Sequence, residues 1–326
     1  MRRASGSHSA WAESGRLACR VEDGAGMHRT PHTRTARTGR MLITGANGLL
    51  GKEITRYFSN GFEVYPTDLA ECDVTSAKEC MQVVGGFRPE VVVHCAAYTA
   101  VDRAEREEKA AFALNADGTR NVALACREHR SLLVTFSTDY VFDGASERPY
   151  AEDDPVDPLS VYGRSKLAAE EAVREVAPDF LLLRTQWLFG AHGRSFVSSI
   201  LERAEKGEEF KVVSDQKGSP TYTRDLADAV RRLLDTGARG VFHFSNEGET
   251  SFFEYAAFLL AHTGWGETNV TAISTSDIPR DLYPAPRPLN ALLSKEKYRK
   301  ETGVSPRHWE DAILDFLRTG IEGSRA

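Results

Sequence analysis

The sequence of 326 residues contains no apolar run near the roughly 20 residues that a helix needs to cross a bilayer, so we predict no membrane span. Its five cysteines are scattered and odd in number, without a CxxC pair or the His/Cys spacing of a zinc site. This pattern argues against a disulfide framework and for a reducing compartment, and we therefore expect a cytoplasmic protein.

Positive charge is in the minority over most of the chain. The net charge is −6, and residues 1–40 carry eight Arg, no Lys and three acidic residues, or +5, so residues 41–326 carry −6 − 5 = −11. An acidic body argues against nucleic-acid binding. It does not argue against a small anionic ligand, because local backbone amides and a few cations decide that interaction.

Residues 1–40 also lack clustered apolar residues, and we interpret them as a disordered N-terminal extension. Three origins fit: an Arg-rich targeting peptide, residues added for expression, or a true translation start at Met27 or Met41. We favour the third, because recognisable structure begins at Met41, and leave the segment out of the fold prediction.

From Met41 onward, short apolar runs alternate with helical patterns, which predicts an α/β fold with a doubly wound parallel sheet covered on both faces. The predicted strands are 41–44, 62–65, 91–97, 132–137 and 180–184. The first predicted helix follows the glycines and ends at Phe58, and the next two cover 76–84 and 108–129. A fourth runs from an Asp157-Pro158 N-cap to about Val176. The sequence after residue 40 shows no internal repeat.

After Thr185 the regular pattern weakens, which predicts a second, smaller and discontinuous lobe. Residues 241–244 are expected to return to the main sheet. The predicted division is 41–186 plus about 223–246 for the nucleotide-binding domain, and about 187–222 plus 247–322 for the substrate-binding lobe.

Three glycines, Gly45, Gly48 and Gly51, lie between the first strand and the first helix. Glycine permits a tight turn and lets backbone N–H groups approach a pyrophosphate at the helix N-terminus. Asp68 follows the second strand, 23 residues after Gly45, where a carboxylate accepts from a ribose 2′-OH and favours NAD over NADP. A plain loop aspartate is the alternative interpretation.

Thr138 lies at the C-terminal end of the predicted strand 132–137. Tyr162 and Lys166 follow it by 24 and 28 residues and are four residues apart on one predicted helix. In open parallel sheets, ligands bind at the carboxyl ends of the strands. A tyrosine next to an ammonium has its pKa lowered and is a candidate general acid/base. An exposed helix that carries Tyr and Lys by chance is the alternative.

Together these motifs resemble the extended short-chain dehydrogenases/reductases that act on nucleotide sugars. The segments 96–102 (AAYTAVD), 137–144 (STDYVFDG), 184–190 (RTQWLFG), 215–221 (DQKGSPT) and Arg287-Pro288 resemble the dTDP-4-dehydrorhamnose reductase family. The resemblance covers residues 41–317 and implies a Rossmann-type fold, NADPH or NADH as cofactor, and a dTDP-4-keto-6-deoxy sugar as substrate.

The resemblance also implies roles for residues. Tyr162 would donate a proton to the C4 oxygen, Lys166 would lower the tyrosine pKa and bind the nicotinamide ribose, and Thr138 would hydrogen-bond the reacting oxygen. The residues implied at the cofactor are Gly45, Asn47, Gly48, Leu49, Gly51, Asp68, Asp73, Val74, Ala96, Ala97, Tyr98, Tyr162 and Lys166. Those implied at the substrate are Thr138, Asp139, Tyr140, Trp187 and Arg287.

The sequence departs from the family at two places. Ala291 stands where relatives often have Ser, which removes a polar contact. Glu53 matches a carboxylate that binds a subunit-bridging magnesium in some relatives, but Arg224 stands where another is expected. We therefore predict no metal site and no metal-bridged dimer, and leave a homodimer of another kind open.

Other functions compete with this one. A dehydratase of the same superfamily typically has Thr-Asp-Glu where Tyr140 follows Thr138-Asp139, and a phenol does not replace a carboxylic proton donor. Trp187 and the Asp215-Gln216 segment fit a reductase better than an epimerase of the same fold. A non-catalytic subunit resembling methionine adenosyltransferase β lacks a match to Trp187.

Overall fold

The computed structural model of the protein describes residues 39–323. Most of the predicted N-terminal extension lies outside the described residues. Arg40, which the sequence assigned to that extension, is instead the first residue of β1 (Arg40–Thr44). Within the described residues, no helix has the length and apolar character needed to cross a membrane. The cysteines at 72, 80, 95 and 126 are free thiols.

The main sheet has six strands in the order β10-β5-β4-β3-β1-β2, and every neighbouring pair is parallel. After β1, its strands are β2 (Glu63–Thr67), β3 (Val91–His94), β4 (Leu132–Thr138), β5 (Phe180–Thr185) and β10 (Gly240–His243). β3 and β4 are buried at every position, as expected for strands covered on both faces. The predicted doubly wound α/β fold and the return of the chain at β10 are confirmed.

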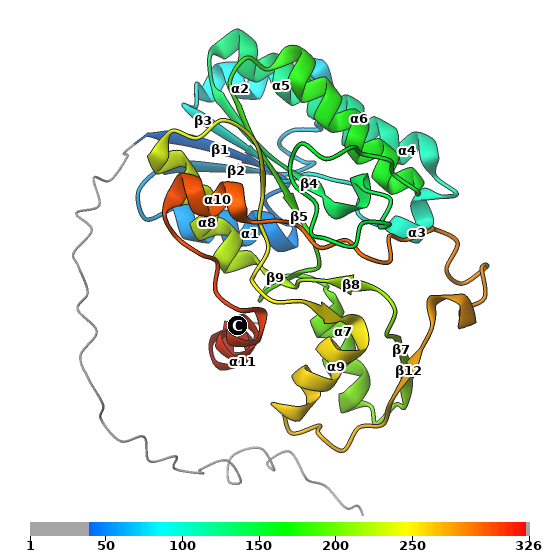
Figure 1. The fold of residues 1–326 in the computed structure, drawn as a ribbon. Helices are drawn as coiled ribbons and strands as arrows, with labels where there is room; N and C mark the ends of the chain where they lie inside the picture. The colour runs from blue at the N-terminus through cyan, green and yellow to red at the C-terminus, as the bar shows by residue number, and fades with distance from the viewer. Residues whose placement is uncertain (1–38, 324–326) are drawn as a thin grey trace, which may run out of the picture. The chain divides into compact units, whose positions relative to one another are not determined.

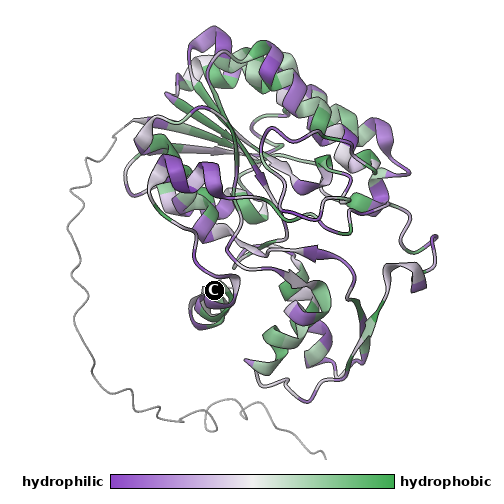
Figure 2. Cartoon of the chain, in the orientation of Figure 1, coloured by the Kyte–Doolittle hydropathy of each residue, from purple (hydrophilic) through white to green (hydrophobic). Residues whose placement is uncertain are grey.

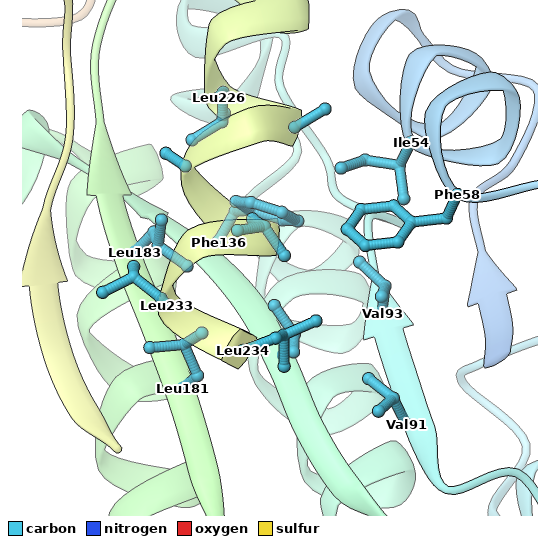
Figure 3. Packing of buried hydrophobic residues seen from close by; sticks show 14 of the residues in the cluster. Ile54, Phe58, Val91, Val93, Phe136, Leu181, Leu183, Leu226, Leu233 and Leu234 are labelled. Carbon is cyan, nitrogen blue, oxygen red and sulfur yellow. The ribbon is translucent and has the colours of Figure 1, made fainter. Parts of the chain in front are cut away.

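Helices cover both faces of this sheet (Figure 1). One face packs against α1 (Leu49–Phe58), α8 (Thr223–Thr236) and Tyr298 of α10 (Glu296–Thr302). The other face packs against α2 (Ala77–Phe87), α5 (Gly118–His129) and α6 (Val161–Val176). Figure 3 shows the first of these cores, where Ile54 and Phe58 of α1 and Leu233 of α8 meet the strands.

Two helix predictions differ from the structure. α6 begins at Val161, with Ser160 as its N-cap accepting from the Gly163 N–H at 3.1 Å, so the predicted Asp157-Pro158 cap is wrong. The Asp157 N–H instead donates to the Val141 carbonyl. The predicted helix 108–129 consists of α4 (Glu108–Phe112), a π-helical segment η1 (Ala113–Asp117) and α5.

The remaining elements form short two-stranded sheets and an aromatic-rich core. The strands are β6 (Leu188–Phe189), β7 (Phe210–Val213), β8 (Lys217–Gly218), β9 (Thr221–Tyr222), β11 (Thr250–Ser251) and β12 (Val270–Ile273). The helices are α3 (Val101–Ala104), α7 (Phe196–Glu205), α9 (Phe252–Ala261) and α11 (Trp309–Gly323), with 3₁₀ turns η2 (Asp139–Val141) and η3 (Thr275–Asp277). Hydrophobic residues of α7 and α9 (green in Figure 2) supply much of this core. The division into two lobes stays a prediction.

Candidate active site

The carboxyl end of β4 is the first part of the candidate site. β4 ends at Thr138, and the chain turns at once into η2, which carries Asp139 and Tyr140. The Thr138 hydroxyl accepts from the Tyr140 N–H at 3.2 Å and donates to the Asp139 carboxylate at 2.9 Å. The strand end therefore holds a buried hydroxyl and a buried carboxyl side by side.

The start of α6 brings Tyr162 to this turn. Gly163 permits the approach, because a Cβ at this position would collide with the Tyr140 carbonyl oxygen. The rings of Tyr140 and Tyr162 meet edge to face with centroids 5.5 Å apart. The structure thus brings together Thr138, Asp139, Tyr140 and Tyr162, as the sequence predicts.

The acid strength of Tyr162 differs from the prediction. Burial raises the pKa of Tyr162 to about 12, against a lowering by the hydrogen bond with Thr138, and the charge of Asp139 raises it further. Lys166 is not among the causes, so the predicted lowering of the Tyr162 pKa by the ammonium is wrong. A phenol with a raised pKa holds its proton at neutral pH and is a weaker acid than free tyrosine.

Lys166 lies one helical turn further along α6 and is buried. Burial lowers the pKa of Lys166 to about 8, while Glu170 and Cys95 raise it. Glu170 is held by Arg184 of β5, with Nε to Oε1 and Nη2 to Oε2 both at 2.8 Å. Glu170 forms ion pairs with Arg184 and Arg174, and the Lys166 ammonium has no ion pair within the described residues.

Asp139 makes the stability of the protein depend on pH. Burial raises the pKa of Asp139 to about 7, and one carboxyl oxygen has no hydrogen-bond partner among the described residues. The corresponding pKa in the unfolded chain is about 3.9. The folded protein therefore keeps a proton that the unfolded chain releases, and this contribution is complete below about pH 4 and lost as the pH rises to 7.

Asp139→Asn removes this titration. Between pH 4 and pH 7, we expect the unfolding free energy of the wild type to fall relative to the variant by on the order of 4 kcal/mol. Urea unfolding of both proteins at the two pH values measures this change. A difference between the two proteins that is the same at both pH values would contradict the prediction.

A cavity of about 380 Å³ lies at the carboxyl ends of β1, β2 and β3. Eight of the predicted cofactor residues line it, together with Leu69, Cys72, Cys95 and Leu114, which the sequence did not single out. The eight are Gly45, Asn47, Gly48, Asp68, Asp73, Val74, Ala96 and Ala97. Leu49, Gly51, Tyr98, Tyr162 and Lys166 are not among its lining residues.

The residues that line this cavity fit a dinucleotide. Gly45 has φ 66°, and a Cβ there would lie 2.5 Å from the Ala96 nitrogen, so only glycine leaves the space between β1 and β3 open. The N-terminus of α1 has no side-chain cap at Gly48, which leaves its first N–H groups for an anion. Asp68 accepts from the Asn47 and Leu69 N–H groups at 2.9 and 2.8 Å and lines the cavity.

Asn115 is a site residue that the sequence analysis missed. It is fully buried in the π-helical η1 and holds the backbone of Tyr98 from both sides, accepting from its N–H at 2.7 Å and donating to its carbonyl at 3.1 Å. It also donates to Ser165 of α6 at 2.9 Å. Asn115 thus joins the segment that follows β3 to α6. Its position in a π-helical segment is the structural feature that points to a functional role, because such segments are frequent at functional sites.

Trp187 and Arg287 lie in segments that follow the main sheet. Trp187 has the unusual φ of 47° and stacks on Phe252 with ring centroids 3.8 Å apart. None of the described contacts joins Trp187 to Thr138 or Tyr162. Arg287 pairs with Asp102 at 2.6 Å. Burial raises the pKa of Tyr140, and the charge of Arg287 opposes this rise. Arg287 is therefore near the turn that carries Tyr140, whereas the place of Trp187 in the site stays a prediction.

The two residues considered for a bridging metal have protein partners. Glu53 pairs with Arg56, and its Oε2 lies 3.7 Å from His192 Nε2. Arg224 Nη1 lies 3.8 Å from Asp315 Oδ2. The absence of a metal-bridged dimer stays a prediction.

Comparison with known proteins identifies the family. Residues 39–321 match the family described as RmlD substrate binding domain. The chain is 37% identical over 289 residues to dTDP-4-dehydrorhamnose reductase of Burkholderia thailandensis, which covers 84% of this chain and 96% of the relative. It is 41% identical over 282 residues to a probable dTDP-4,6-dihydroxy-2-methyloxan-3-one 4-ketoreductase of Streptomyces antibioticus, covering 85% and 94%.

A solved structure gives the same result. The crystal structure of dTDP-4-dehydrorhamnose reductase from Bacillus anthracis in complex with NADP matches with a TM-score of 0.82 and 36% identity, covering 86% of this chain and 99% of that one. The sequence and structure matches both extend over nearly all of the described residues. The chain therefore belongs to the RmlD substrate binding domain family and resembles its dTDP-4-dehydrorhamnose reductases throughout.

Proposed function

We propose that the protein reduces the C4 keto group of dTDP-4-dehydro-β-L-rhamnose to give dTDP-L-rhamnose, with NADH or NADPH as the reductant. The observation that carries this proposal is the meeting of Thr138 and Tyr162 at the end of β4, on a sheet whose neighbouring strands end at a glycine-lined cavity. The names of the reductases that match over the whole described part support the substrate class.

In this reaction the reduced nicotinamide, when bound, supplies the hydride to C4. Tyr162 supplies the proton to the C4 oxygen, so that one hydride and one proton together convert the ketone to the alcohol. The raised pKa keeps the phenol protonated before the reaction. The Thr138 hydroxyl holds the substrate oxygen near the phenol, and Lys166 binds the nicotinamide ribose.

The other predicted residues have supporting roles in the proposal. Asp139 and Tyr140 form the wall of the sugar site beside Tyr162, Trp187 contacts the sugar from the substrate-binding lobe, and Arg287 binds the nucleotide end of the substrate. We also propose that the protein works in the cytoplasm, and a homodimer stays open.

The decisive experiment is an assay of wild-type protein with dTDP-4-dehydro-β-L-rhamnose and each cofactor, followed by the loss of absorbance at 340 nm and by identification of the sugar product. We expect dTDP-L-rhamnose. Parallel assays with other dTDP-4-keto-6-deoxy sugars test the broader substrate range suggested by the name of the Streptomyces relative. Cofactor binding without oxidation of NADH or NADPH by any of these sugars would refute the reductase and favour a non-catalytic subunit.

Asp68 is expected to make NADH the preferred cofactor. Asp68 lines the cavity, where a carboxylate accepts from a ribose 2′-OH but repels a 2′-phosphate. Asp68→Asn keeps the size of the side chain and removes the charge. We expect the ratio of kcat/KM for NADPH to that for NADH to rise roughly tenfold, equivalent to about 1.4 kcal/mol.

Glu71→Gln is the control for this prediction. It removes a negative charge three residues away, from a residue that does not line the cavity. The control is expected to leave the cofactor ratio within twofold of the wild-type value, a change of about 0.4 kcal/mol. If both variants shift the ratio equally, the effect is one of net charge and Asp68 does not select the cofactor.

A further inference from the structure

Three of the motif segments meet on one late loop, which we define as residues 274–290. Asp215 accepts from the Thr275 N–H at 2.9 Å, and the Lys217 N–H donates to the Leu289 carbonyl at 2.7 Å. The Gly144 carbonyl accepts from the Asn290 N–H at 3.2 Å. Through these hydrogen bonds, the segments 215–221 and 137–144 hold the two ends of the late loop.

The middle of the late loop is held by the third segment, 96–102, through Asp102 of α3. Arg287 donates from Nη2 to Asp102 Oδ2 at 2.6 Å and from Nη1 to Oδ1 at 3.0 Å. The Ala285 N–H donates to the same carboxylate at 3.3 Å, and its carbonyl accepts from Arg287 Nη1 at 2.8 Å. Asp102 therefore fixes both a side chain and the backbone of the loop.

This pairing leaves one edge of the guanidinium free. Of its five N–H groups, two donate to Asp102 and one to Ala285. The Nε–H and one Nη2–H have no hydrogen bond among the described residues, although the Arg287 side chain is only 8% exposed. These two groups form the edge of the fork that binds a carboxylate or a phosphate through two parallel hydrogen bonds.

The orientation of that edge is fixed by further contacts. The Arg287 guanidinium lies 3.3 Å from the centre of the Tyr283 ring. The Tyr283 hydroxyl in turn accepts from Gln216 Nε2 at 3.3 Å. Arg287 is thus clamped between a carboxylate and an aromatic ring, and its charge opposes the rise in the Tyr140 pKa that burial causes.

We propose that Asp102 is a positioning residue: by holding the end of the Arg287 guanidinium and the Ala285 backbone, it presents the free edge of Arg287 to a phosphate oxygen of the nucleotide sugar. This inference rests on the proposed function for the identity of the ligand. Asp102 is not among the residues that line the cofactor cavity, and its side chain is 38% exposed. It acts on the substrate only through Arg287 and the late loop.

The test uses Asp102→Asn, Arg287→Gln and the double variant in the full chain. Asp102→Asn is expected to raise the KM for the dTDP-keto sugar and the Kd for dTDP alone roughly tenfold, while the KM for NADH stays within twofold. The double variant should be no worse than Arg287→Gln alone, because Asp102 acts through that arginine. Hydrogen exchange should be faster in Asp102→Asn at the Tyr283, Ala285 and Arg287 amides, which are the backbone N–H groups of 283–287 because residues 284 and 286 are prolines.

Asp154→Asn is the matched control. Asp154 also holds an arginine through two hydrogen bonds, from Arg148 at 2.7 and 2.8 Å, and accepts from the Ala151 N–H at 2.7 Å, but in another loop. This variant is expected to change neither the KM for the sugar nucleotide nor exchange in the late loop. A merely structural effect of losing such a pair would appear equally in both variants as lower thermal stability.

The outcomes separate this inference from the proposed function. If the wild type reduces no keto sugar, the proposed function fails, and dTDP binding and exchange of 283–287 still test Asp102. Unchanged exchange in Asp102→Asn, tighter dTDP binding by that variant, or additive losses in the double variant would each overturn the positioning role.

Discussion

Replacing Tyr162 with phenylalanine is expected to lower kcat by roughly 10²- to 10⁴-fold, the usual contribution of a positioned proton donor. The variant keeps the ring that packs edge to face against Tyr140 and loses only the hydroxyl that hydrogen-bonds with Thr138. The Kd for NADH should stay within twofold, a change of about 0.4 kcal/mol, because the cofactor cavity is formed by other residues. Steady-state kinetics and a fluorescence titration with NADH measure the two quantities.

Tyr255→Phe is the control for the loss of a buried hydroxyl. The Tyr255 hydroxyl is fully buried in the aromatic core and has no hydrogen-bond partner within the part of the chain that the structure describes. Removing it should leave kcat unchanged. If Tyr162→Phe retains wild-type turnover, the proton comes from another group and the assignment of Tyr162 as the acid is wrong.

The second large effect is expected at the buried ion pair between α6 and β5. Glu170 is 0% and Arg184 2% exposed. Burial raises the pKa of Glu170, but the hydrogen bond and charge of Arg184 oppose this, and the net pKa is lowered. Arg184→Met leaves a buried carboxylate without its main partner, which costs about 3–5 kcal/mol of unfolding free energy. Urea or thermal unfolding measures the loss.

Two further variants test this explanation. Arg184→Met with Glu170→Met removes both charges and should regain most of the loss, since an apolar pair is often as stable as a buried ion pair. Arg120→Met breaks the exposed pair with Glu175, also on α6, and should cost less than about 1 kcal/mol. Equal losses in Arg184→Met and Arg120→Met would show that burial does not matter.

The strands of the main sheet could be predicted from the sequence because their composition is distinctive. Val91–His94 and Leu132–Thr138 are apolar along most of their length, since helices cover both faces, and glycines mark the first strand–helix turn. The same local signals placed Thr138 at a strand end and Tyr162 and Lys166 on one helix. Local composition thus predicted the elements and the residues at their ends.

Other features depend on contacts that local patterns do not contain. Asp102 and Arg287 are 185 residues apart, and neither position shows which charge it pairs with. The pKa of Tyr162 rises instead of falling because burial, which depends on the whole fold, outweighs the hydrogen bond with Thr138, and the charge of Asp139 adds to the rise. The cap of α6 was misplaced because Asp157-Pro158 has the right residue types, whereas the side chain that accepts from the first turn of the helix is that of Ser160, three residues later.

The place of Tyr298 in the main core bears on how the chain folds as it is synthesised. Its ring packs against Phe244 at 5.0 Å, and the neighbouring Lys297 donates to the Val241 carbonyl at 2.6 Å. The core that begins with Met41 is therefore completed by a helix near the opposite end of the chain. At roughly 5–20 residues per second, the ribosome presents this helix many seconds after β1. Until α10 has been synthesised, one apolar face of the nascent sheet is incompletely covered.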